Sequence, residues 1–130
     1  MADQRVDPSL SVATDAPGRV DADVVAIPVF DDDDLTDIVD LEVASAGEVT
    51  RVRESGVLGS AVGETVLLRT DGAGWQPRHV LLVGAGPQAP APVRRLREAA
   101  ASAARAAMRH RIERLAFVCR TSAPPDRAVQ

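Results

Sequence analysis

Two apolar runs, at residues 24–30 and, beginning with His79, at 79–83, constrain the fold of this chain more than any other feature. Such runs suit β-strands that are covered on both faces, as in sheets with helices packed on each side. The 130 residues are enough for one domain, and only 2% of them are aromatic, so the core must consist of Val, Leu, Ile and Ala. We therefore predict an α/β fold with three layers, in which helices flank a mixed, mostly parallel sheet.

Further strands are expected around these two runs, at residues 10–14, 64–69 and 115–119. The spacing of 64–69 and 79–83, with turn residues at 71–74 between them, suggests that these two strands are neighbours in the sheet. Another turn is expected at 15–19. Pro28 lacks a backbone N–H, so it should mark a strand end or an irregular edge.

An acidic run at Asp31–Asp34 precedes Leu35, Ile38 and Val39, where an amphipathic helix could begin. Four carboxylates could also hold a divalent cation, but the ligand spacing of a calcium loop is missing. Acidic residues complement a helix dipole and cap its free N–H groups, so we favour the helix start. This helix should continue to about Val43, and a second, short one is expected near residues 49–54.

The clearest helix follows Pro90 and Pro92, which suit its entry and first turn. Its predicted buried face comprises Val93, Leu96, Ala100, Ala103 and Ala107, and its opposite face Glu98, Ser102, Arg105 and Arg109. With the strands on either side it would form a crossover unit, which implies a parallel pair. The arginines around it could bind nucleic acid, but aromatic residues are missing and the chain carries a net charge of −4, so a solvated face is favoured.

A glycine-containing segment, Gly84, Ala85 and Gly86, lies between a buried strand and this helix and is the candidate ligand-binding loop. It supplies only half of the dinucleotide fingerprint. The chain has no lysine, so a phosphate-loop lysine is excluded. A tight turn at the strand exit is the favoured interpretation.

No catalytic or metal-binding residue is predicted in this chain. His79 and His110 lie far apart and have no paired cysteine. The serines lack the elbow of a nucleophilic triad, and Cys119 is expected to be a buried small hydrophobe. No apolar run could span a membrane and no secretory signal is visible, so we expect a cytoplasmic protein. We also expect residues 1–8 to form a frayed tail.

The order of segments resembles the N-terminal domain of the leucyl aminopeptidase (cytosol aminopeptidase) family. Three stretches carry the resemblance: residues 23–30 with the acidic run that follows, the glycine-spaced run 56–65, and residues 78–86 with the Arg- and Ala-rich helix. The likeness spans residues 9–130. The ending, from Pro124 to Gln130, resembles the approach to a later helix, which would leave the domain truncated at its C-terminal end.

This resemblance implies a cytoplasmic, hexameric exopeptidase whose two divalent metals (Mn or Zn), catalytic lysine and arginine, and bicarbonate site lie in a C-terminal domain. None of those motifs occurs here, so the expected partners are that catalytic domain or other subunits. The family's N-terminal domain also resembles a macro domain, a fold that elsewhere binds ADP-ribose, and some bacterial members bind DNA. The alternative is a stand-alone module that binds a nucleotide or an ADP-ribose-type ligand.

Overall fold

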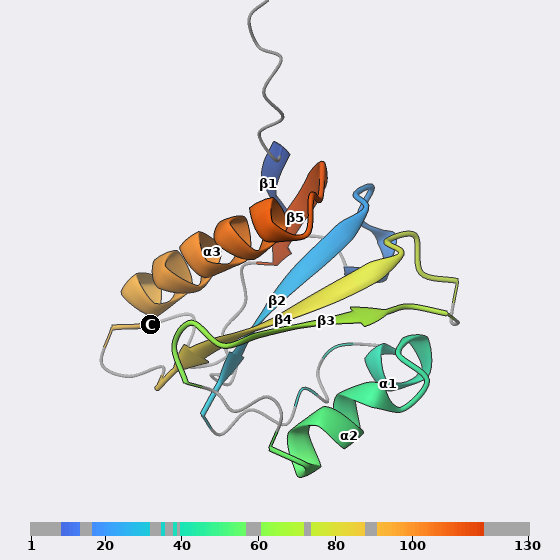
Figure 1. Cartoon of the computed structure of the whole chain (residues 1–130), viewed down its shortest axis with the longest axis horizontal. Helices are drawn as coiled ribbons and strands as arrows, with labels where there is room; N and C mark the ends of the chain where they lie inside the picture. The colour runs from blue at the N-terminus through green and yellow to red at the C-terminus, as the bar shows by residue number, and fades with distance from the viewer. Residues whose placement is uncertain are drawn as a thin grey trace, which may run out of the picture.

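The computed structural model describes residues 9–13, 17–31, 35, 38, 40–56, 61–71, 74–87 and 91–118, with the backbone alone at 9–13 and 92. Cys119, the expected tail at 1–8 and the ending after residue 120 lie outside this part. The elements in chain order are β1 (Ser9–Ala13), η1 (Pro17–Arg19), β2 (Val24–Phe30), α1 (Leu41–Ala44), α2 (Glu48–Glu54), β3 (Thr65–Arg69), β4 (His79–Gly86), α3 (Pro92–Arg109) and β5 (Arg114–Val118) (Figure 1).

These strands form one five-stranded sheet in the order β1-β5-β2-β4-β3. In this order, the strands β1, β5, β2 and β4 run parallel to one another. The last strand, β3, pairs antiparallel with β4. The predicted mixed, mostly parallel sheet is therefore confirmed. The prediction that β3 and β4 are neighbours in the sheet is confirmed as well. The crossover through α3 needs a correction: β4 and β5 run parallel, but β2 lies between them, so the unit skips one strand.

Helices cover both faces of the sheet, with α3 on one side and α1 and α2 on the other (Figure 1). Alternate side chains of the same strand enter the two cores. In β2, Val24, Ala26 and Phe30 pack toward α3, whereas Val25, Ile27 and Val29 pack toward α1 and α2. All seven β2 residues are buried, which is why the run is apolar without interruption.

Pro28 lies inside β2 rather than at its end, in register with Val83 of β4. The pairing between β2 and β5 covers only Val24 to Ala26, so Pro28 stands beyond the part of β2 that is paired on both sides. The register with β4 then shifts between Val29 and Phe30. The expected irregularity is confirmed, because a strand tolerates a residue without N–H where its ladder is incomplete.

The helix predicted from Leu35 to about Val43 is wrong in its first part. Leu35 and Asp40 have φ values of 63°, in the left-handed region, and neither they nor Ile38 are helical. A right-handed helix cannot continue through such residues. Only four residues, Leu41–Ala44, form α1, whereas the short helix expected near 49–54 is confirmed as α2.

The extent of α3 is confirmed, with Pro92 in its first turn, and its predicted buried face is confirmed at four of five residues. Ser102, assigned to the solvent face, is only 4% exposed, and Val93, assigned to the buried face, is 66% exposed. The core side consists of Ala99, Ala103, Ala106 and Ala107, with Leu96 and Ala100 partly buried. The hydrophobic period therefore identified the stripe that packs on the sheet, and its errors are limited to Val93 and Ser102.

The single tryptophan fixes the short helix η1 against the sheet. A Cβ atom on Gly18 would lie 2.6 Å from two atoms of the Trp75 indole, so only glycine allows this approach. The backbone joins the contact, because Gln76 N–H donates to the Gly18 carbonyl at 2.8 Å. Trp75 also packs against the core beneath α1 and α2.

Candidate ligand-binding edge of the sheet

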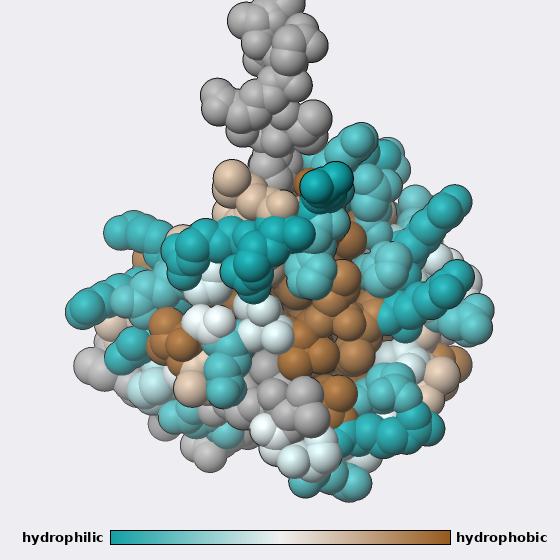
Figure 2. Space-filling model, in the orientation of Figure 1, coloured by the Kyte–Doolittle hydropathy of each residue, from teal (hydrophilic) through white to brown (hydrophobic). Residues whose placement is uncertain are grey.

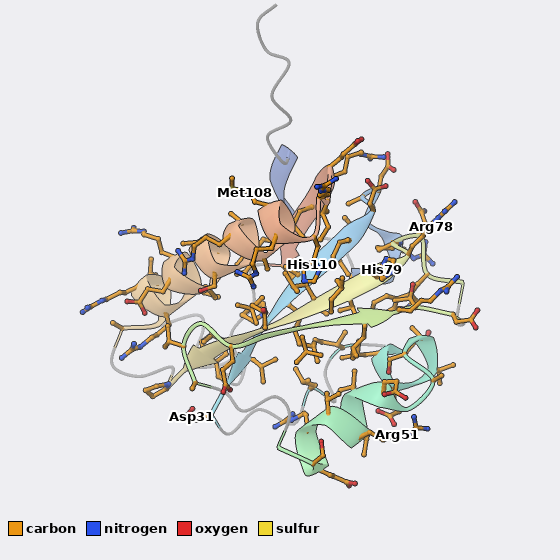
Figure 3. The ribbon with its side chains drawn as sticks, in the orientation of Figure 1. Asp31, Arg51, Arg78, His79, Met108 and His110 are labelled. Atoms are coloured by element: carbon orange, nitrogen blue, oxygen red, sulfur yellow. The ribbon has the colours of Figure 1, made fainter. Side chains whose placement is uncertain are left out.

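The carboxyl ends of β2 and β4 and the start of α3 define one edge of the molecule. Asp31 follows β2, and in Figure 3 it lies at the opposite end of the sheet from Arg78 and His79, where β4 begins. Ligands of parallel α/β sheets usually bind at this edge. The predicted ligand residues Gly84, Ala85 and Gly86 all lie here.

These three residues do not form the predicted turn, because they are the last residues of β4 and are buried. Gly84 is in register with Val29 and Gly86 with Phe30, so β4 bulges by one residue at Ala85. The Gly84 N–H donates to the Glu64 carbonyl at 2.7 Å, and the Gly86 carbonyl accepts from the Asp31 N–H at 3.1 Å. The chain continues as a strand because neighbouring segments bond to it on both sides.

Gly86 shows why a glycine stands at the end of this strand. Its φ is +72°, a conformation that other residues rarely adopt, and a Cβ atom there would lie 3.0 Å from Val62 Cγ2. The segment before β3 therefore packs over Gly86. Gly86 permits this close approach of the Val62 side chain, which is a structural role that does not need a ligand.

The first turn of α3 carries the positive potential of this edge. Arg95 N–H makes the first intrahelical bond, to Ala91, so the N–H groups of Val93 and Arg94 precede the helical ladder. Such N–H groups attract anions. Glu98 partly offsets this charge through ion pairs with Arg94 at 3.5 Å and Arg95 at 3.3 Å. The Arg95 Nε is buried and has no hydrogen-bond partner in the described part of the chain.

The other reactive side chains stay apart. His79 begins β4, whereas His110 is exposed at the C-terminal end of α3. Ser55 is exposed after α2, and Ser60, Ser122 and Cys119 lie outside the described residues. Among the residues that the structure describes, no three His, Cys, Asp or Glu side chains could together hold a metal ion.

An ion pair that sequence reasoning missed lies at the other end of the sheet. Arg114, at the start of β5, contacts the Asp21 carboxylate at 2.9 Å. The hydrogen bond that Arg114 donates to the Asp21 carboxylate, and the negative charge of that carboxylate, raise the pKa of Arg114. The pair links residues 93 positions apart in sequence, and no local pattern marks it.

Among the helices that the structure describes, none combines the length and the apolar character that a membrane span requires.

Comparison with known proteins gives one family. Residues 26–129 match the model of the N-terminal domain of the cytosol aminopeptidase family. No curated protein matches the chain. A mutant of tomato leucine aminopeptidase has a similar structure, with a TM-score of 0.70 and 18% identity over 98% of this chain and 26% of that enzyme. The macrodomain of Mycobacterium tuberculosis DarG also has a similar fold, with a TM-score of 0.60 and 12% identity over 85% of this chain and 75% of that one.

Proposed function

Because the chain belongs to the cytosol aminopeptidase family, as its N-terminal domain, we propose that it is the non-catalytic domain of a leucyl aminopeptidase-like metallo-exopeptidase. Its role would be assembly or regulation. Metal-dependent hydrolysis, with two Mn or Zn ions, would reside in a C-terminal catalytic domain. The partners would be that domain and other subunits, in the cytoplasm, and residues 9–130 would act as one unit.

The family match carries this proposal, since it covers residues 26–129. The chain spans about a quarter of the tomato enzyme, 26%, which leaves most of that enzyme to other parts of its polypeptide. The absence of lysine from all 130 residues agrees with this division, because the family's catalytic lysine has no counterpart here. The described residues form a scaffold: buried strands, a packed helix layer on each face, and no cluster of metal-binding side chains.

A peptidase assay tests the division of labour. The purified 130-residue chain is incubated with a chromogenic leucyl amide and either Mn²⁺ or Zn²⁺, two ions that could activate water in such an enzyme. We expect no hydrolysis above that of a mock purification. Turnover that rises with the concentration of the chain and disappears on unfolding would refute the proposal.

The position of this domain in a larger enzyme needs a second test. The natural reading frame is extended beyond Gln130, and the longer polypeptide is assayed with and without residues 1–118. We expect the longer form to hydrolyse the substrate, and removal of these residues to change its subunit composition or its rate. If both forms contain the same number of subunits in solution and have the same kinetics, the assembly and regulatory role is wrong.

The DarG likeness supports a second candidate, a macro-like module that binds a nucleotide or an ADP-ribose-type ligand. The edge formed by Gly84, Ala85, Gly86 and the first turn of α3 would be the site, with N–H groups available for a phosphate. Two backbone groups of the glycine segment are already bonded within the fold, so α3 would supply the main contacts.

Calorimetric titration with ADP-ribose separates this candidate from the first. Binding that is lost in Arg95→Glu would support a ligand at this edge, because Arg95 belongs to the first turn of α3. Arg111→Glu is the control and should bind normally, because the exposed Arg111 follows the last turn of α3. The absence of heat at millimolar ligand would count against the module.

A further inference from the structure

The two helix layers carry opposite charge. Helix α3 holds five arginines against one glutamate, Glu98, a formal charge of +4. The segment from Asp40 to Glu54 on the other face holds four carboxylates against Arg51 and Arg53, a charge of −2. In Figure 2 hydrophilic side chains cover both helix layers, and an apolar area over the sheet edge at β3 lies between them.

The solvent face of α3, defined here as the basic face, comprises the exposed side chains Arg94, Arg97, Arg105, Met108 and Arg109. Glu98 pairs with Arg94, but no described carboxylate contacts Arg97, Arg105 or Arg109. Arg105 donates a hydrogen bond to the Ser102 hydroxyl instead, and Arg109 donates one to the Thr65 hydroxyl. From Arg94 to Arg109 the unbalanced charge extends roughly 22 Å along the helix.

The outer surface of α1 and α2, defined here as the acidic face, has the exposed carboxylates Asp40, Glu42 and Glu54. Beside them is a hollow of about 520 Å³. Its apolar lining consists of Leu35, Ile38, Leu41, Val43 and Val49, and its polar lining of Asp40, Glu42, Thr50 and Arg53. Val43 is 61% exposed, so the hollow is accessible from solvent.

The apolar side chains of the two faces also match. Met108 is 61% exposed and projects from α3 away from the sheet (Figure 3). Methionine adapts its shape to irregular apolar surfaces. A nucleic acid would neutralise the arginines, but it would leave Met108 and the exposed Val93 without an apolar partner. None of the chain's three aromatic residues lies in α3, so no base-stacking platform stands beside the arginines.

We propose that the basic face of one copy docks on the acidic face of a second copy, with Met108 entering the hollow beside Val43. The two faces lie on opposite sides of one sheet, so they cannot meet within a molecule, and the contact is head to tail. Complementary charge sets the orientation. A contact of one helix face is smaller than the roughly 800 Å² per partner of stable complexes, so the association is weak and depends on salt. The inference stands independently of the aminopeptidase role.

Sedimentation equilibrium of the 130-residue chain, at several concentrations and at about 50 and 500 mM salt, measures this association. We expect reversible growth beyond the monomer at low salt and at least about tenfold weaker association at high salt. Two variants isolate the faces: Arg97→Glu with Arg105→Glu, and Glu42→Arg with Glu54→Arg. Each variant alone should be monomeric, because the first lowers the charge of α3 from +4 to 0 and the second changes the charge of Asp40–Glu54 from −2 to +2.

An equimolar mixture of these two variants is the decisive sample. The unchanged basic face of the Glu42→Arg, Glu54→Arg variant can dock on the unchanged acidic face of the Arg97→Glu, Arg105→Glu variant, so association should return. Arg69→Glu with Arg78→Glu is the matched control, since it makes the same charge change at exposed residues outside both faces and should still associate. Met108→Gln should weaken association without changing its dependence on salt.

Three results would overturn the proposal. One is a chain that stays monomeric at low salt while circular dichroism shows it folded. Another is a mixture of the two variants that fails to associate. A third is capture of a short DNA duplex that depends on Arg97 and Arg105 without any self-association, which would assign the basic face to nucleic acid.

Discussion

Against one face of the sheet lies a single helix of 18 residues, α3, whereas α1 and α2, with four and seven residues, cover the other. The α3 layer meets the sheet through alanines, and Ala99, Ala103, Ala106 and Ala107 are fully buried. The α1/α2 layer uses the larger side chains of Leu41, Val49 and Val52. Small residues bring a long helix close to the strands, and larger ones fill the space under short helices.

The backbone differs between the layers as well. Among the described residues, four that are not glycine have positive φ, and three of them, Leu35, Asp40 and Ala46, belong to the α1/α2 side. Each such conformation costs about 1 kcal/mol or more and persists only where the surrounding structure enforces it. A hollow of about 520 Å³ remains beside these helices. The comparison indicates that the α3 layer is close-packed and that the α1/α2 layer is the one able to open locally.

The largest effect is expected from overpacking the α3 layer. Ala103→Leu adds three carbon atoms where the side chain is fully buried against the sheet, and should lower the free energy of unfolding by about 3 kcal/mol. Urea denaturation measures this. Ala101→Leu, on the exposed side of the same helix, should change it by less than about 0.5 kcal/mol. Equal losses for both variants would contradict the close packing of this layer.

A smaller and more local loss is expected in the other layer. Leu41, the first residue of α1, is 2% exposed, and Leu41→Ala should cost about 2 kcal/mol because it removes buried apolar contacts. Hydrogen exchange should show faster opening of α1 and α2 amides, while α3 amides remain protected. Val43→Ala, at a position 61% exposed, is the control. Uniform acceleration across both layers would show that they unfold as one unit.

The smallest effect concerns the junction of α1 and α2. The buried Ser45 hydroxyl donates to the Glu42 carbonyl at 3.2 Å and accepts from the Val49 N–H at 3.3 Å. Ser45→Ala leaves that N–H without this partner and should cost about 1 kcal/mol, measured by thermal unfolding. Ser55→Ala, at the exposed end of α2, should be nearly neutral, and a comparable loss there would argue against a special role for Ser45.

The same contrast explains which parts of the fold could be predicted. Strands β2 and β4 followed from uninterrupted apolar runs, and α3 from apolar residues at helical intervals. The break before α1 could not be seen, since leucine, as at Leu35, very rarely adopts a left-handed backbone and aspartate, as at Asp40, does so only occasionally. The orientation of α3 followed from the same intervals, and only Val93 and Ser102 were assigned to the wrong side.

The candidate site was predictable only in its place along the chain. Gly84 to Gly86 lie at the expected edge of the sheet, but their glycines indicated a turn, and the structure extends β4 through them. The difference comes from long-range partners: Glu64 accepts from Gly84, and Asp31 donates to Gly86. The Arg114–Asp21 pair escaped prediction for the same reason, because only the folded sheet brings the two residues together.

Trp75 gives the chain an internal optical probe. It is the only tryptophan and the chain has no tyrosine, so near-ultraviolet emission comes from one indole. That indole rests on Gly18 and on the core beneath α1 and α2, and it has no place in the core beneath α3. Its spectrum therefore reports on η1 and on the α1/α2 layer. Far-ultraviolet dichroism receives more helical signal from the 18 residues of α3 than from the four and seven residues of α1 and α2, and it reports mainly on the opposite face.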